Sequence, residues 1–154
     1  MSEADNRRAV ERLFEGLNAK NPGVMNEVFT DDSVMAYPQS GEVIRGRDNL
    51  RAMMEHRPGL TPDTGPDLAS VRAKASDEHR VLAPLFTVVR VQGRGDAGTT
   101  WLRARYPDGS WWWIVVVYEL RDGRIARSTS FFAPQFVAPE WRAPFVERRS
   151  APET

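Results

Sequence analysis

Two hydroxyl side chains, Tyr37 and Ser130, are the residues best suited in this sequence to act on a bound molecule. A tyrosine hydroxyl can donate a hydrogen bond to a carbonyl oxygen, and a serine hydroxyl can hold a water molecule. Each lies in a stretch typical of a β-strand, residues 34–37 and 124–132. Serine is a poor base, so the pair lacks the carboxylate or imidazole that proton transfer usually needs. We take them as candidate catalytic residues with roles left open.

Histidines and paired acids, the other usual carriers of acid–base and metal chemistry, are weak candidates. The two histidines, His56 and His79, do not stand at a metal-ligand spacing such as His-x-x-x-His. Asp31 and Asp32 could form a pair of bases at a pocket mouth, but solvated residues at a helix end explain them better. The chain has no cysteine, so thiolate sites are excluded. We expect neither a metal nor a cofactor.

The composition is that of an ordinary globular domain. Of 154 residues 41% are hydrophobic and 27% charged, and 21 basic residues balance 21 acidic ones. Nucleic-acid binders carry a basic excess or stripe, so we expect no nucleic-acid partner. No run approaches the ~18 apolar residues of a membrane span, and the N-terminal residues lack a signal-peptide pattern. The sequence therefore predicts a cytoplasmic protein without membrane contact.

The first half of the chain predicts three helices and two short strands. The first helix has apolar residues at i, i+3, i+4 and i+7. Asn21-Pro22 begins a short second helix, and a third runs from Arg47-Asp48 to Pro58-Gly59. Strands at 34–37 and 42–45 separate the last two. The helices would turn inward Val10, Leu13, Phe14 and Leu17, then Val24, Met25, Val28 and Phe29, then Leu50, Met53 and Met54.

The second half predicts a meander of strands. Turn residues separate the strand-like runs, above all the dipeptide Asp122-Gly123. The glycine-rich stretch 93–98 reads as a loop, and it lacks the strand-to-helix setting of a phosphate-binding loop. Helices followed by an antiparallel meander indicate the α+β class. The expected strands are 70–75, 81–91, 99–106, 111–121 and 124–132.

The C-terminal stretch 133–154 carries an alanine-proline pair every five residues, with Phe136, Trp141 and Phe145 between them. Proline removes backbone donors and excludes a long helix or a central strand. We therefore expect an extended strap whose aromatics dock on the domain or on a partner subunit. The alternative, a proline-rich recognition ligand, lacks a clean PxxP core. We assign the strap to the same domain as residues 1–132.

Two stretches of the chain resemble the SnoaL-like proteins of the nuclear transport factor 2-like superfamily, which include polyketide cyclases and ketosteroid isomerases. The first spans residues 8–41, with Ala9-Val10-Glu11-Arg12 and Phe29-Thr30-Asp31-Asp32. The second spans residues 116–132, around Tyr118-Glu119-Leu120-Arg121-Asp122-Gly123, and is also similar to limonene epoxide hydrolase. The resemblance implies three N-terminal helices packed on a strongly bent, mostly antiparallel sheet. This cystatin-like α+β roll would enclose a conical pocket for a flat apolar ligand.

The acids that perform chemistry in these relatives are replaced in this chain. The isomerase base aligns with Tyr37, its tyrosine donor with Leu13, and its protonated acid with Val116. The aspartate of the epoxide hydrolase aligns with Ser130. Leucine and valine can neither donate nor transfer a proton, so neither mechanism is expected here.

What remains is a mostly apolar pocket with a few hydroxyls. Its composition assumes a one-residue bulge in the 122–123 hairpin, which puts Val116 and Ser130 on one face. A strict two-residue register would instead pair Val115 with Ser130. The competing view, in which Tyr37 and Tyr118 are core residues with satisfied hydroxyls, stays open. The predicted ligand-binding residues are Leu13, Tyr37, Val116, Tyr118, Ser128, Ser130 and Phe132.

The strand from Trp111 is apolar at nearly every position, so both of its faces should be covered. We expect a homodimer through the outer face of the sheet, with Trp111, Trp113, Val115 and Val117 at the contact. The alternative is that the strap covers them. Three functions are compatible with these patterns: a binding protein for a small, largely apolar molecule, a SnoaL-like enzyme such as a cyclase, isomerase, hydratase or lyase, or a pocketless interaction module.

Overall fold

Helices and strands segregate in space as they do in sequence. The computed structural model describes residues 3–58 and 85–149. Its six strands form one sheet in the order β2-β1-β6-β5-β4-β3, antiparallel except between β1 and β6. The elements are α1 (Glu3–Asn18), η1 (Pro22–Val24), α2 (Met25–Val28), β1 (Phe29–Tyr37), β2 (Glu42–Arg45), α3 (Arg47–Glu55), β3 (Phe86–Arg94), β4 (Ala97–Arg105), β5 (Trp111–Arg121), β6 (Arg124–Pro134) and η2 (Glu140–Phe145).

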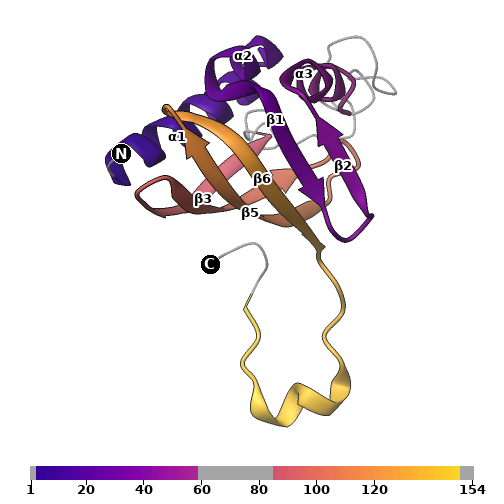
Figure 1. The fold of residues 1–154 in the computed structure, drawn as a ribbon. Helices are drawn as coiled ribbons and strands as arrows, with labels where there is room; N and C mark the ends of the chain where they lie inside the picture. The colour runs from indigo at the N-terminus through magenta and orange to yellow at the C-terminus, as the bar shows by residue number, and fades with distance from the viewer. Residues whose placement is uncertain (1–2, 59–84, 150–154) are drawn as a thin grey trace.

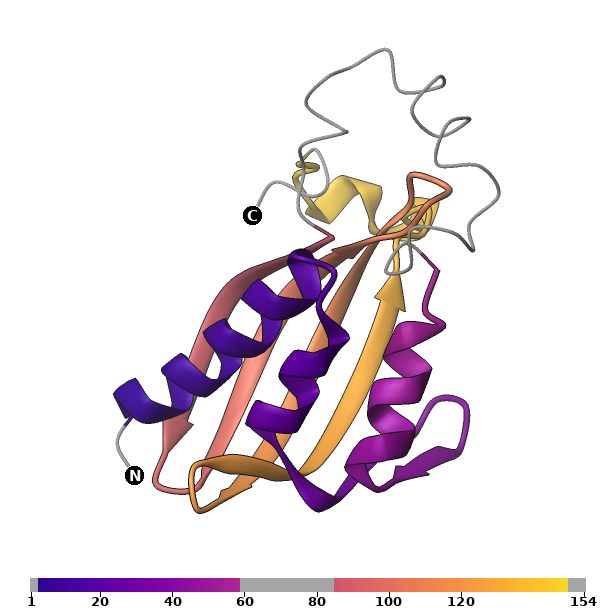
Figure 2. The same cartoon turned by 90° about the horizontal axis from the view of Figure 1, so that it is seen from above.

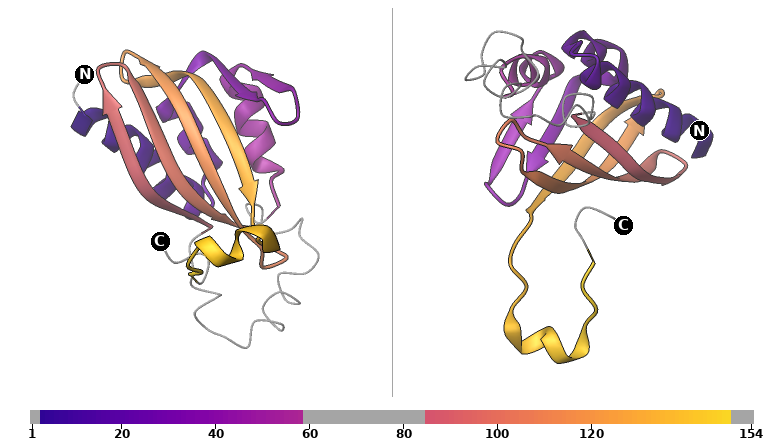
Figure 3. Two further views of the ribbon diagram at one scale, coloured as in Figure 1. Left: turned by 90° about the horizontal axis from the view of Figure 1, so that it is seen from below. Right: turned by 180° about the vertical axis from the view of Figure 1, so that it is seen from behind.

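All three α-helices cover the same face of this bent sheet, which we call the inner face (Figures 1 and 2). The opposite, outer face of the long strands is bare when the molecule is viewed from below (Figure 3). The predicted α+β roll, with helices on a bent and mostly antiparallel sheet, is confirmed. None of the described helices is long and apolar enough to cross a membrane.

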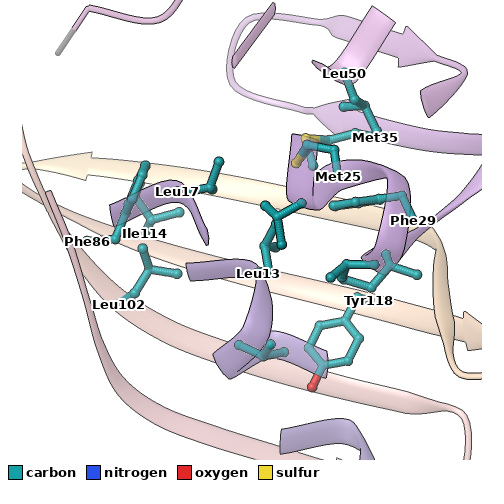
Figure 4. Close-up of a cluster of buried hydrophobic side chains, with 14 of the residues drawn as sticks. Leu13, Leu17, Met25, Phe29, Met35, Leu50, Phe86, Leu102, Ile114 and Tyr118 are labelled. Atoms are coloured by element: carbon teal, nitrogen blue, oxygen red, sulfur yellow. The ribbon is translucent and has the colours of Figure 1, made fainter. Parts of the chain in front are cut away.

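The core lies between the helices and the inner face. Side chains from the helices α1, α2 and α3 meet those of the sheet there (Figure 4). The predicted inward residues Val10, Leu17 and Leu50 are at most 2% exposed. On the sheet side of the core, buried residues alternate with more exposed ones along β4, because every second residue faces the helices.

Two asparagines tie α1 to the edge strand β3. The side-chain amide of Asn18 donates to the carbonyl oxygen of Phe86 (2.8 Å) and accepts from its backbone N–H (2.8 Å). Asn6, fully buried, donates to the carbonyl oxygen of Gly95 (3.0 Å). An edge strand leaves such backbone groups without ladder partners. The two amides therefore fix both ends of the helix on the sheet.

The β5–β6 hairpin contains the expected bulge, but not in the turn itself. Asp122 and Gly123 both have positive φ (51° and 77°) and make a tight two-residue connection. The register then slips by one residue beyond the Leu120–Ile125 pair, because β6 carries an extra residue there. As a result Val116 pairs with Ser130, and both lie on the inner face.

Several boundaries differ from the sequence-based expectation. Phe29 does not extend the second helix; its backbone is extended (φ −103°, ψ 149°) and it opens β1. A residue four positions after Met25 fits a helical stripe and a strand start equally well, and its pairing with Ile125 of β6 selects the strand. Asp31 and Asp32 therefore lie on a strand and not at a helix end. The expected strand at 70–75 and the start of that at 81–91 lie outside the described residues.

The glycine-rich stretch 93–98 is a loop only at its centre, where Gly95 and Asp96 form the turn of the β3–β4 hairpin. Its outer residues belong to the strands, with Gly93 paired to Gly98. Glycine weakens strands in general, but here it makes room for neighbours. A β-carbon at position 98 would lie 2.4 Å from the Tyr118 hydroxyl oxygen, and one at position 93 would lie 2.6 Å from the Asn6 side chain.

Residues 135–149, which we call the arm, leave the end of β6 and extend from the sheet on the side away from the helices (Figure 1). Part of the arm is the 3-10 helix η2, so the expectation of a wholly extended strap was wrong. Phe136, Trp141 and Phe145 are 78%, 74% and 83% exposed. These three aromatics do not dock on the domain of their own chain.

Candidate functional site

A cavity of about 430 Å³ opens between the helices and the inner face of the sheet. Its walls come from α1, β1, the end of α3 and the central strands, and they are mostly apolar. All seven side chains predicted to bind a ligand lie on these walls: Leu13, Tyr37, Val116, Tyr118, Ser128, Ser130 and Phe132. Their role in binding stays a prediction.

Strand register arranges the sheet wall in three rows, each crossing β6, β5 and β4. The first row is Ser128, Tyr118 and Gly98; the second is Ser130, Val116 and Thr100; the third is Phe132, Ile114 and Leu102. Hydroxyls thus gather in two adjacent rows, and the third row is wholly apolar. The walls combine a large apolar area with a few polar groups, which is typical of small-molecule pockets.

The buried hydroxyls of the first two rows are short of partners. Ser128, Ser130 and Thr100 are 5%, 4% and 1% exposed. The Ser128 hydroxyl has no hydrogen-bond partner among the described residues. Burial raises the pKa of Tyr118, and the neighbouring Thr100 hydroxyl partly opposes this effect. Since an unpaired buried hydroxyl is costly, these groups favour a site that holds a polar atom of a ligand or water.

Tyr37 lies at the end of β1 beside Phe132, with the two rings edge to face and 4.9 Å apart. Its hydroxyl donates only to the Met53 sulfur, at 3.9 Å, which is a weak acceptor. Burial raises the pKa of Tyr37 to about 12. The phenol is therefore neutral at physiological pH, where it can donate a hydrogen bond but cannot act as a base.

Arg57, two residues beyond the end of α3, is a wall residue that the sequence analysis left out. This side chain lies over the rings of Phe86 and Tyr106, with its guanidinium carbon 4.6 and 4.7 Å from their centroids. Arg57 follows the wall residues Met53 and Met54 by four and three residues, and its backbone N–H donates to the carbonyl oxygen of Met54 (3.2 Å), so the turn after α3 keeps it on the same side. That spacing was the available signal, but Pro58-Gly59 directed attention to the helix end.

A second, more open hollow of about 470 Å³ adjoins the cavity. Three aromatic side chains, Tyr37, Tyr106 and Phe132, line both spaces. They therefore form the boundary between the enclosed cavity and the outside. The remaining walls of the outer hollow include Gln39, whose side-chain amide donates to the carbonyl oxygen of Phe132 at 2.7 Å.

Carboxylates do not take part in this site. No aspartate or glutamate lies among the described residues that line the cavity. Asp31 and Asp32 are exposed, and Asp32 forms an ion pair with Arg121 at the surface. Residues 3–58 and 85–149 also contain no group of three or more side chains able to hold a metal ion. Within this part of the chain, the polar side chains that line the cavity are hydroxyls, the Arg57 guanidinium and the imidazole of His56, whose Nδ1 lies 2.7 Å from the carbonyl oxygen of Ala52.

Comparison with known proteins places this geometry in a family. The model of the SnoaL-like domain matches residues 10–128. No curated protein is similar enough in sequence to be matched to this chain.

Solved structures repeat the fold. An NTF-2 like protein of unknown function from Burkholderia xenovorans LB400 is 29% identical, and the alignment covers 97% of this chain and 98% of that one (TM-score 0.72). A candidate ketosteroid isomerase from Kribbella flavida is 21% identical over 97% and 93% of the two chains (TM-score 0.73). An epoxide hydrolase of the LEH-like type from M. tuberculosis is 17% identical over 84% and 83% (TM-score 0.56).

Proposed function

The chain belongs to the SnoaL-like domain family, and from this premise we propose that it binds a small, largely apolar molecule in the cavity on the inner face. The observation that carries the proposal is the cavity itself. About 430 Å³ is within the roughly 300–1,000 Å³ of ligand pockets.

The cavity argues against a pocketless interaction module, which would fill this space with large side chains. The remaining alternative is an enzyme with a non-standard site. Tyr37 and Ser130 would then act only by hydrogen bonding, because the phenol is neutral and a serine hydroxyl is a poor base. Binding needs nothing more than the groups present, so we rank it above catalysis.

A thermal-shift screen against steroids, polyketide-like aromatics, terpenoids and fatty acids tests the proposal. A ligand present at 100 times its dissociation constant should raise the melting temperature by roughly 5–10 °C. Val116→Phe, which fills the cavity, should abolish the shift. Val43→Phe is the matched control, since it adds the same bulk at a 51% exposed position of β2 that does not line the cavity. The absence of a thermal shift in the wild type across the panel, or equal shifts in both variants, would contradict a ligand in this cavity.

The same screen separates binding from catalysis. If a compound that raises the melting temperature is also turned over, and Tyr37→Phe abolishes that turnover, the enzyme is favoured over the binding protein.

We further propose that the outer face mediates a homodimer. Its central row, Trp101, Val115 and Phe131, is apolar across three strands. Val117 and Phe131 are 46% and 42% exposed in the single chain, a pattern that soluble monomers seldom keep over a contiguous patch. Trp111 and Trp113 lie on the same face, and the centroids of their rings are 5.7 and 5.9 Å from the guanidinium carbon of Arg103.

The arm supports the same association. It extends on the side of the sheet that carries the uncovered outer face (Figures 1 and 3). A second copy seated on that face would lie within reach of its three exposed aromatics. The alignments with the two structures that cover 97% of this chain include most of residues 133–149, so the arm is not peculiar to this sequence.

Sedimentation equilibrium of variants distinguishes the contribution of the outer face to dimer formation from that of the arm. Val117→Lys should convert the dimer to monomers, because a charge would be buried at the centre of the contact. Val43→Lys, at a 51% exposed position of β2, is the control and should leave the mass unchanged. Replacing Phe136, Trp141 and Phe145 by serine should weaken association without abolishing it. A wild-type monomer at micromolar concentration would contradict the proposed dimer.

A further inference from the structure

Among the described residues that line the cavity, Arg57 carries a permanent charge, and one of its nitrogens has no hydrogen-bond partner there. Its neighbours on the wall are mostly apolar, with a few hydroxyls and the imidazole of His56. Its Nη1 donates to the carbonyl oxygen of Pro58 (3.2 Å). Its Nη2 is enclosed and has no hydrogen-bond partner among the described residues. None of the ion pairs between described residues includes Arg57.

The guanidinium is held firmly in spite of this. The rings of Phe86 and Tyr106 both lie within 5 Å of it and provide cation–π contact. Burial lowers the pKa of Arg57, and the neighbouring Tyr106 and Tyr37 side chains only partly offset that effect. An arginine keeps its charge in proteins, so the cost of burial is met by lost hydration instead of by lost charge. An anion at this point would restore what burial removes.

We propose that Arg57 binds a planar oxyanion of the ligand, of which a carboxylate is the simplest, so that the natural ligand is an apolar molecule with one acidic end. The inference deepens the proposed function and rests on it. The fork of an arginine matches a carboxylate with two parallel hydrogen bonds, and Nη2, which has no partner among the described residues, can make one of them.

The arrangement of the walls orients such a ligand. Arg57 and Tyr37 both line the cavity, and each influences the pKa of the other. Tyr37 can therefore offer a second donor to the same oxyanion, since among the described residues its hydroxyl donates only to the weakly accepting Met53 sulfur. The apolar skeleton would extend inward over the row of Phe132, Ile114 and Leu102.

Matched pairs of acids and amides test the inference by isothermal titration of the full-length protein at pH 7.5. Suitable probes are naphthalene-2-carboxylate, 4-phenylbenzoate and octanoate, each beside its primary amide. Acid and amide share shape and differ in charge. We expect the wild type to bind the acid of at least one pair about 10- to 100-fold more tightly than the amide, the usual size of a charged hydrogen bond in an enclosed site.

The Arg57→Met variant should lose this preference for the acid while its affinity for the amide stays within about threefold of the wild type. Arg124→Met is the matched control, because Arg124 is exposed at the start of β6 and does not line the cavity; it should retain the preference. If Arg57→Met fails to fold, Arg57→Lys and Arg57→Gln replace it. The lysine should keep part of the preference and the glutamine none.

Equal binding of acid and amide by the wild type would overturn the role of Arg57 and leave the apolar pocket standing. A preference for the acid that survives in Arg57→Met, or in both replacement variants, would also overturn it. Failure of both members of every pair to bind the folded wild type would contradict the pocket and the inference together.

Discussion

The two faces of strands β4, β5 and β6 are built from the same backbone and differ in what they leave unpaired. The inner face presents Leu102, Ile114 and Tyr118, each at most 5% exposed. The outer face presents Val117 and Phe131, each more than 40% exposed. On the inner side, the Ser128 hydroxyl and one nitrogen of Arg57 have no hydrogen-bond partner in the part of the chain that the structure describes. On the outer side, apolar side chains such as Val117 and Phe131 are left uncovered in the single chain.

This difference distinguishes two kinds of recognition. An enclosed apolar space with a few unpaired polar atoms selects a small molecule by the position of its own polar atoms. A broad apolar surface selects a large partner by shape and area. The inner face therefore has the properties of a ligand site and the outer face those of a protein contact, although both lie within one sheet. The predictions below test this contrast, beginning with the largest expected effect.

Shortening a side chain on the inner face should lower the free energy of unfolding much more than shortening one on the outer face. Leu102 is fully buried in the apolar row, and Leu102→Ala should lower the free energy of unfolding by about 2–5 kcal/mol. Val117→Ala on the outer face should lower it by about 0.5 kcal/mol or less for the dissociated chain. Urea unfolding at low protein concentration measures both. Equal losses would mean that the two faces are packed alike.

Position 98 sharpens the contrast, because the inner face tolerates no side chain there. Gly98→Ala would bring a β-carbon to 2.4 Å from the Tyr118 hydroxyl, so the ring must shift. We expect a loss of about 1–3 kcal/mol from overpacking, measured by urea unfolding. The double variant Gly98→Ala with Tyr118→Phe should recover part of that loss. If the double variant is no more stable than Gly98→Ala alone, the Tyr118 hydroxyl is not the group that the new β-carbon displaces.

Alkaline titration probes the inner face without changing its shape. The chain has three tyrosines, Tyr37, Tyr106 and Tyr118. Tyr37 should ionise at about pH 12 instead of near pH 10. Because its folded pKa is raised, its contribution to stability is complete below about pH 10 and is lost as pH rises toward 12. Tyrosinate absorbance should therefore show a late step that becomes smaller in Tyr37→Phe, where Tyr118, whose pKa burial also raises, still contributes; an unchanged curve would contradict the burial of the Tyr37 hydroxyl.

Acid titration of the exposed surface should give the smallest effect. The Arg121 side chain lowers the pKa of Asp32 below its ordinary value by hydrogen bonding. A lowered pKa stabilises the fold above the unfolded value near pH 4, and this contribution is lost as pH falls through the folded value. Both side chains are exposed, so Asp32→Asn should change the acid unfolding midpoint little. A large change would show that this surface pair matters more than the inner hydroxyls.

Much of the fold and of the site could be predicted from local sequence. The period of two along a strand predicted which residues of 111–121 share a face, and Asp122-Gly123 predicted the final hairpin. The predicted ligand residues of that hairpin line one cavity for this reason, and the family resemblance indicated Leu13 and Tyr37. A period of two sets the face of every residue in a strand once one residue is placed.

Other features depend on contacts between distant parts of the chain. Phe29 opens a strand because β6 pairs with it, and the glycines at 93 and 98 serve as strand residues because Asn6 and Tyr118 occupy the space above them. Arg57 enters the site because Phe86 and Tyr106, from elements well beyond α3, hold its guanidinium. Local patterns state which side of an element is apolar. Whether the facing sides close fully or leave a cavity, and which polar groups remain unpaired in it, is decided only when all the elements pack together.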